Sequence, residues 1–315
     1  MAHFQGGSTD NFLSTVSGQA NSFFVPEIYS KKVQVALRRA AVAEAICNTD
    51  YMGEISSFGD TVNIIKEPQI AVADYTRGLA VASTDLTDQE LVLIIDQAKS
   101  FSFKIDDLEK RFSHVNFQAV AADNAAYALR DAMDSNILAA ISAGATVTTG
   151  MGTTSAPIDI GFATGEIDPL NQMSLAAKEL DEANAPEDGR WFVAAPEWYN
   201  QLANTSSKLL SVDFNAGQGS IRNGLVASGL LRGFQMYKSN NVPTNDLSGA
   251  TPAGAGDAPE ALFGHISATS AVSSMNKVET VRDTGTFSDI VRGLMVWGRK
   301  VLRPEITGKI IYTID

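Results

Sequence analysis

Apolar side chains recur at steps of three and four residues along the middle of the chain. The series runs Leu108, Phe112, Val115, Ala119, Ala122, Ala126, Leu129, Met133, Ile137 and Ile141. Because neither Gly nor Pro interrupts residues 117–143, this spacing predicts one helix of about 40 Å that ends at Gly144. Many of its apolar positions are Ala, so we expect a neighbouring sheet or helix to approach it closely.

Before that helix the pattern changes to one typical of strands. Residues 61–66 (TVNIIK) and 91–95 (LVLII) are rich in β-branched side chains, and apolar and polar positions alternate in residues 101–105 (FSFKI). The short connection between the last two runs predicts that they form a hairpin. Residues 67–88 are polar and weakly periodic, so we expect them to project from the body. Long projecting loops usually serve a function.

The second half of the chain indicates an α/β layer. Ser174 is a candidate N-cap for a helix over 175–183, residues 191–195 (WFVAA) predict a buried strand, and Pro196 opens a second helix. Further on, we expect a strand at 234–237 and an exposed surface loop over 244–260. The remaining residues read as strands: LFGHISATSAV, NKVETVR, IVRGLMVWGRKVL and KIIYTI.

The first 24 residues differ from the rest. They are rich in Gly, Ser, Asn, Gln and Thr, and they contain too little apolar side chain to offset the entropy of ordering. We expect an arm that orders only against another surface. From Pro26 to Asn48, apolar residues at helical spacing predict a helix that leads into the body.

Composition narrows the class of protein. The 315 residues include 24 Lys+Arg and 36 Asp+Glu, a net charge of -12 that argues against a protein wrapped around nucleic acid. The single cysteine, Cys47, excludes a disulfide framework, and its apolar neighbours predict a buried thiol. Without a basic, apolar leader or an 18-residue apolar run, the sequence predicts a soluble protein made in the cytoplasm.

Residues with catalytic chemistry do not converge on a site. The histidines are His3, His114 and His265, and the sequence lacks H-E-x-x-H, C-x-x-C, EF-hand, phosphate-loop and G-x-S-x-G motifs. We therefore predict no catalysis, no metal and no cofactor. The alternative is an α/β hydrolase or transferase with an unusual site. It would require His265 within hydrogen-bond reach of a Ser and a buried carboxylate.

Five segments, taken in chain order, resemble the tailed-bacteriophage major capsid proteins with the HK97 fold. FVPEIYSKKVQVALRRAAVAEAICN resembles the passage from an N-terminal arm into the body. GDTVNI, the excursion with DYTRG, and LVLIIDQAKSFSFKIDDLEK resemble the strands and tip of the extended E-loop. AADNAAYALRDAMDSNILAAI resembles the spine helix of the peripheral (P) domain, with Asp134 matching the acid often found before its final turn.

The other two segments resemble the axial (A) domain, and one further stretch resembles its exit. AAKELDEANAPEDGRWFVAAPEWYNQL has a helix, an N-x-P-x-x-G-R turn, a strand and a Pro-led helix, like the start of that domain. GLLRGFQMYKSNNVP resembles its strand before a Pro turn, and VRGLMVWGRKVLRPE its return into the P-domain.

The resemblance implies an α+β, HK97-like capsid fold. Its expected parts are an N-terminal arm (1–24), the way into the P-domain (25–58), an extended E-loop hairpin (59–104), a P-domain with a long spine helix (105–170), an α/β A-domain (171–285) and a strand returning into the P-domain (286–315).

The implied function is that of a major capsid protein, which self-assembles into an icosahedral shell around packaged phage double-stranded DNA. The expected location is the virion capsid, after assembly in the bacterial host cytoplasm. Expected partners are further copies in hexameric and pentameric capsomers, a scaffolding protein, a portal protein and a cement protein, with DNA enclosed but not read and no membrane. The alternative is an encapsulin-like cellular nanocompartment shell. A decoration or tail protein fits the long helix poorly.

The resemblance also implies which residues meet neighbouring subunits. The E-loop would lie along one adjacent subunit and the arm along another. The residues expected in these contacts are Phe12, Phe23, Phe24, Glu67, Tyr75, Arg77, Asp85 and Asp88. Some members cross-link covalently through Lys and Asn, but the sequence places no such site here.

Overall fold

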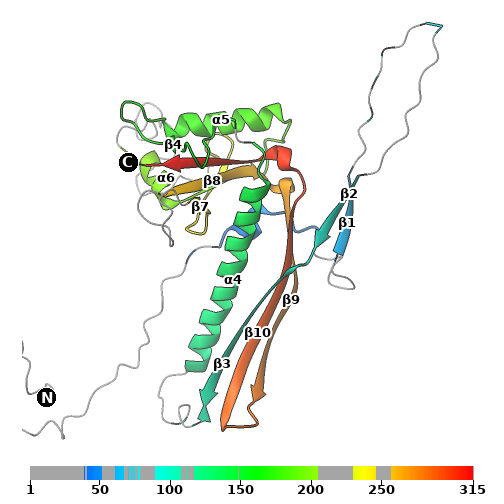
Figure 1. The fold of residues 1–315 in the computed structure, drawn as a ribbon, viewed down its shortest axis with the longest axis vertical. Helices are drawn as coiled ribbons and strands as arrows, with labels where there is room; N and C mark the ends of the chain where they lie inside the picture. The colour runs from blue at the N-terminus through cyan, green and yellow to red at the C-terminus, as the bar shows by residue number, and fades with distance from the viewer. Residues whose placement is uncertain are drawn as a thin grey trace, which may run out of the picture.

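The computed structural model describes residues 39, 41–51, 61–66, 70, 72, 74, 77–78, 89–107, 111, 117–147, 149–204, 230–245 and 257–314. These residues form a lobe built on a six-stranded sheet, a long three-stranded sheet beside one long helix, and a two-stranded hairpin that points away from both (Figure 1).

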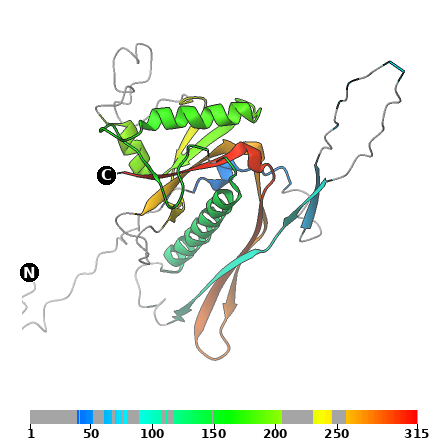
Figure 2. The same ribbon diagram turned by 45° about the horizontal axis from the view of Figure 1, so that its top comes forward.

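The lobe sheet has the strand order β4-β11-β8-β5-β6. Its strands are β4 (Ile158–Asp159), β11 (Thr307–Thr313), β8 (Ala258–His265), β5 (Arg190–Ala194) and β6 (Gln235–Lys238), and β7 (Thr244–Asn245) pairs with β8. Strands β5 and β6 run parallel, whereas β8 is antiparallel to both of its neighbours in the order. Helices α5 (Pro169–Glu182) and α6 (Pro196–Leu202) lie over one face, and the end of α4 (Phe117–Gly144) approaches the other (Figures 1 and 2).

Burial on both faces explains why β5 reads as a continuous apolar run. Phe192 and Ala194 pack in the core under α5 and α6, whereas Trp191 and Val193 point into a second core against α4. Alternate residues of a strand face opposite sides of a sheet, so a strand covered twice needs apolar residues at every position.

The long sheet has the order β3-β10-β9 and is antiparallel throughout. It consists of β3 (Gln97–Asp106), β10 (Ser288–Val301) and β9 (Thr269–Arg282). Helix α4 lies along one face (Figure 1), where Trp297 is fully buried and its Nε1 donates to Asn136 Oδ1 at 3.3 Å. Ile137 and Ile141 of the same helix are fully buried in this core.

The projecting hairpin consists of β1 (Thr61–Lys66) and β2 (Gln89–Ile94), paired from Thr61 with Ile94 to Lys66 with Gln89. Its base is held by a small core in which Leu93 packs with Val272 of β9. Short helical segments complete the described fold: α1 (Ala43–Ile46), η3 (Ile266–Ala268) and η4 (Pro304–Ile306).

The predicted hairpin between residues 91–95 and 101–105 is wrong. The link from β2 to β3 crosses β10 at Gly298, where an added Cβ would lie 2.6 Å from the Ile94 carbonyl oxygen. Strand β3 therefore pairs with β10, and β2 pairs with β1 on the far side of the excursion. The expectation that two paired strands enclose the excursion is confirmed, because β1 and β2 pair with each other on either side of it.

Two local predictions also need correction. Helix α5 begins at Pro169, and its N-cap is Asp168, whose Oδ1 accepts from Leu170 N at 2.8 Å. Ser174 is inside the helix, and its Oγ donates to the Leu170 carbonyl. The expected exposed loop over 244–260 is wrong at both ends, because Thr244–Asn245 form β7 and residues 258–260 are buried in β8.

The other elements agree with the pattern. The helix over 117–143, the strand at 191–195, the helix opening at Pro196 and the strand near 234–237 are confirmed. Cys47 is buried, and burial together with the Asp134 carboxylate raises the pKa of its thiol to about 12. The arm over 1–24 lies outside the described residues, as does most of the stretch from Pro26 to Asn48. The single helix expected over that stretch is wrong in its described part, where Ala43–Ile46 are helical and residues 39, 41 and 42 are not.

Candidate assembly surfaces

His265 does not form the constellation that a hydrolase would need. Its Nδ1 lies 2.8 Å from Ser267 Oγ and accepts from Ser267 N, while Nε2 lies 2.7 Å from the carbonyl oxygen of Asp188. A carbonyl oxygen can only accept, so Nε2 donates to it. The third group is a backbone carbonyl and not a buried carboxylate. His265 therefore joins the 184–189 turn to β8 and η3.

Metal and membrane sites receive no support from the described part of the chain. Within it, no three His, Cys, Asp or Glu side chains gather in an arrangement that could hold a metal ion. None of its helices is long and apolar enough to cross a membrane.

Among the residues expected to meet other subunits, the structure describes Arg77. It is exposed in a turn with Gly78, whose φ of +92° explains the glycine at that position. The remaining members of the expected set, Phe12, Phe23, Phe24, Glu67, Tyr75, Asp85 and Asp88, lie outside the described residues.

Apolar side chains near the projecting hairpin are unusually exposed. Ile65 is 78% exposed and Val72 is 96% exposed, and Ile70 and Ile94 are also accessible. The sequence analysis missed these residues. The signal was available: Val62 and Ile64 face the body core, so Ile65 must face away from it. Apolar side chains as exposed as these can contact another protein.

A groove of about 780 Å³ runs between the hairpin base and the lobe. Ile64, Ile65 and Ile70 line it on the hairpin side, and the 183–186 turn and Ile306 line it on the lobe side. The exposed apolar surface of the hairpin is therefore continuous with a groove of the same subunit.

The N-x-P-x-x-G-R turn owes its shape to a buried arginine. Arg190 donates from Nη2 to the Ala185 carbonyl at 2.7 Å and from Nε to the Pro186 carbonyl at 2.8 Å, and it pairs with Asp181 at 2.7 Å. Asn184 and Gly189 have φ values of 56° and 82°, which suit Asn and Gly. This turn fixes the direction in which β5 enters the sheet.

A polar cluster around the buried side chains of Asp134 and Asn241 joins the start of the described body to α4. Asp134 Oδ1 accepts from the N–H groups of Val42 and Ala43, both at 2.7 Å. Asn241 donates to Asp134 Oδ2 at 2.9 Å and to Asp131 Oδ1 at 2.7 Å, and its own Oδ1 accepts from Arg39 at 3.0 Å.

A second buried cluster ties the lobe sheet to the end of α4. Glu260 of β8 is buried, and its Oε1 lies 3.3 Å from Lys309 Nζ and 3.0 Å from Asn245 Nδ2. Its other oxygen accepts from Ser142 of α4. A buried carboxylate needs such partners, since desolvation otherwise disfavours its charge.

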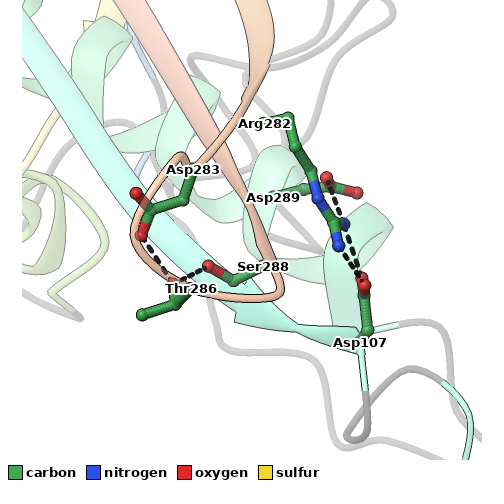
Figure 3. A network of polar contacts seen from close by, with 6 residues as sticks. All are labelled: Asp107, Arg282, Asp283, Thr286, Ser288 and Asp289. Atoms are coloured by element: carbon green, nitrogen blue, oxygen red, sulfur yellow. Dashed lines mark hydrogen bonds and ion pairs between the residues drawn. The ribbon is translucent and has the colours of Figure 1, made fainter.

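The distal end of the long sheet is closed by polar contacts at the β9–β10 turn (Figure 3). Arg282 forms a two-pronged contact with Asp107, which follows β3, and also pairs with Asp289 of β10 at 3.0 Å. Asp283 accepts from Thr286 Oγ1 and from Lys104 Nζ, both at 2.6 Å. The Lys104 and Thr286 hydrogen bonds hold the pKa of Asp283 well below its usual range. Phe287, in the same turn, is almost fully exposed.

Comparisons with known structures identify this arrangement. A chain from Mycobacterium phage Che8 is 27% identical, with a TM-score of 0.73 over 92% of this chain and 97% of that one. The capsid structure of cyanophage P-SCSP1u is 21% identical, with a TM-score of 0.73 and full coverage of both chains. The capsid of an empty GTA particle shares the fold at 10% identity, with a TM-score of 0.64 over 94% of this chain and 98% of that one.

Sequence comparison agrees with the structural similarity. No protein with a curated description matches the sequence. Residues 90–306, however, match the phage capsid protein family, and these residues include α4, the long three-stranded sheet, every strand of the lobe sheet except β11, and the Arg190 turn. The chain therefore belongs to the phage capsid protein family, as a shell-forming structural protein with an HK97-like fold and not as an enzyme.

Proposed function

We propose that this chain is the coat subunit of an icosahedral phage head, arranged in hexameric and pentameric capsomers around packaged double-stranded DNA. The observation that carries the proposal is the projecting β1–β2 hairpin, with Ile65 and Val72 exposed, on a body shared with capsid proteins. In a monomer these apolar side chains stay exposed to water, whereas a shell subunit can bury them against its neighbours.

We propose the same domain division for the subunit. The arm is 1–24, the way into the P-domain 25–58, the E-loop 59–104, the P-domain 105–170, the A-domain 171–285 and the returning strand 286–315. The β1–β2 hairpin supports the E-loop, and α4 supports the spine of the P-domain. Strand β3 extends across the boundary at residue 104, whereas β9 lies inside the 171–285 range and pairs with β10 of the returning strand.

The E-loop and the arm are the proposed contacts with adjacent subunits. Arg77 would meet an acidic group of a neighbour, together with Glu67, Tyr75, Asp85 and Asp88 of the same loop, while Phe12, Phe23 and Phe24 would anchor the arm. The exposed position of Arg77 supports this role, because an exposed arginine can form an ion pair at little desolvation cost.

Assembly of such a shell involves further partners. We propose assembly in the bacterial host cytoplasm with a scaffolding protein and a portal, and a cement protein on the finished particle. The net charge of -12 per copy fits a container that encloses DNA without adhering to it. The similar structures named above come from phages and a GTA particle, and they do not favour the encapsulin-like alternative.

Electron microscopy of the purified chain tests the proposal. We expect closed icosahedral particles, or rings of five and six, when the chain is expressed alone or with its scaffolding protein. A variant lacking residues 1–24 should remain folded, by its circular dichroism and unfolding midpoint, but should yield fewer particles. A uniform monomer or dimer in every condition would overturn the shell function, and normal yield from the truncated chain would overturn the role of the arm.

A further inference from the structure

Strand β9 forms one edge of the long sheet. It pairs with β10 along its whole length, and Asn48 covers its other side at Thr269–Ala271. Beyond that point, no strand in the described ranges lies against residues 272–282. Figure 2 shows this stretch at the outer margin of the sheet. An uncovered edge presents backbone N–H and C=O groups that a further strand can pair with.

The middle of this edge has a self-complementary charge pattern. Lys277 and Glu279 lie on either side of Val278, and their side chains point to the face away from α4. Lys277 Nζ lies 3.3 Å from Glu279 Oε2, and Glu279 also pairs with Arg292 on β10. Val278, on the other face, is 57% exposed. An antiparallel copy of the same strand could therefore place its glutamate opposite this lysine, its lysine opposite this glutamate, and its valine opposite this valine.

We propose that β9 pairs with β9 of a second copy of this chain, antiparallel and about a two-fold axis at Val278, to form a continuous six-stranded sheet. This inference rests on the proposed shell function, which supplies the second copy. In this register Lys277 lies opposite Glu279 of the second copy, and Glu279 lies opposite its Lys277. Arg292, Glu279 and the second copy's lysine then form a row of alternating charge.

Charge also selects the register. A two-fold axis at Lys277 would place two lysines opposite each other, and an axis at Glu279 would place two glutamates opposite each other. Like charges directly opposite across a strand pair are destabilising. The axis at Val278 avoids both, and it brings two exposed valines together with Cβ atoms about 5 Å apart.

Cysteine cross-linking in assembled particles tests the pairing. The variant is Val278→Cys, and the matched control is Thr280→Cys, an exposed position on the same face two residues away. In the proposed register the thiol that Val278→Cys introduces in one chain lies directly opposite the same thiol of the second copy, within reach of a disulfide. The Thr280→Cys thiols would lie about 13 Å apart, because each is displaced by two residues from the axis. The native Cys47 is buried and should not interfere.

Particles are first scored by electron microscopy with the unmodified chain, which tests the shell function alone. In particles of the variants, we expect disulfide-linked dimers on non-reducing gels for Val278→Cys, and much less for Thr280→Cys. Well-formed particles in which neither variant cross-links, or in which both do so equally, overturn the edge pairing and leave the shell function intact.

A charge exchange provides an independent readout. Lys277→Glu should lower particle yield several-fold, because it places Glu opposite Glu. The triple exchange Lys277→Glu, Glu279→Lys and Arg292→Glu restores alternation in every row and should recover the yield. Lys178→Glu, at an exposed ion pair with Glu182 on α5, is the matched control and should assemble normally. Loss of yield that the triple exchange fails to recover contradicts the pairing.

Discussion

The side-chain amide of Asn241 lies 2.9 Å from Asp134 Oδ2, although 107 positions separate the two residues in the chain. The other Asp134 oxygen accepts from the backbone of Val42 and Ala43. One carboxylate on α4 therefore holds both the start of the body and the segment that follows β6. In a shell subunit, this arrangement fixes where the chain before residue 39 leaves the body.

Removal of the Asp134 carboxylate should destabilise the subunit. Asp134→Ala leaves two buried backbone N–H groups without an acceptor and removes one of the two hydrogen bonds that the Asn241 amide donates, so we expect a loss of about 3 kcal/mol in the free energy of unfolding. Asp134→Asn should lose less, because its oxygen can still accept from the backbone. Urea denaturation of the unassembled subunit measures both. Asp123→Asn, on an exposed part of the same helix, is the control and should change stability by under about 0.5 kcal/mol.

The Glu260 cluster predicts strong coupling between two residues of the lobe sheet. Lys309→Met leaves a buried carboxylate without its cation and should cost about 3–5 kcal/mol of stability. The double variant Lys309→Met with Glu260→Met should lose less than the sum of the single changes, since it removes both charges. A double-mutant cycle from urea midpoints measures this coupling. Additive losses would contradict a direct Lys309–Glu260 interaction.

The exposed pair Lys178–Glu182 provides the reference for that cycle. Both side chains are more than half exposed, so solvent screens their attraction. Lys178→Met should therefore leave the free energy of unfolding nearly unchanged.

The buried turn before β5 depends on the guanidinium geometry of Arg190. Arg190→Lys retains the charge but cannot reach two carbonyl oxygens and Asp181 together, so we expect a loss of about 2 kcal/mol. Hydrogen exchange should rise for amides of residues 184–189 more than for the rest of the lobe. Arg303→Lys, at an exposed position, is the matched control. Equal exchange in both variants would show that the turn does not rely on Arg190.

Local sequence pattern is sufficient for elements whose burial shows as a periodic series or a continuous run of apolar residues. The spacing of apolar residues predicts the helix over 117–143, and a continuous apolar run predicts the strand at 191–195. The start of α5 had a local signal, Asp168 followed by Pro169, but the prediction favoured Ser174 instead.

Pairing and long-range contacts could not be predicted from pattern. Strand β3 alternates as a hairpin strand would, and only the fold reveals that its partner is β10, which begins at Ser288. The role of Asp134 depends on Ala43 and Asn241, which are distant in the chain. The resemblance to capsid proteins marked Asp134 as typical of the family, but its hydrogen bonds had to come from the structure.

The β9–β10 turn should loosen in acid because of Asp283. Its pKa is depressed in the folded protein, first by the hydrogen bond from Lys104 and then by that from Thr286. Because the pKa of Asp283 is lower in the folded protein, the folded state stabilises the charged carboxylate relative to the neutral acid. This stabilisation is complete above the unfolded-state pKa and is lost as the pH falls through the folded one.

Exchange of the Gly285 amide, which donates to Asp283 Oδ1 at 3.1 Å, reports on this turn. After correction for the intrinsic rate, we expect constant protection from neutral pH to roughly pH 4, the ordinary range for an aspartate, and falling protection below it. Asp283→Asn should show weaker protection at neutral pH and little change with acid. The difference between the two chains isolates Asp283 from Glu279, whose pKa is also lowered by its contacts with Arg292 and Lys277. The same acid response in both chains would assign the loosening to another group.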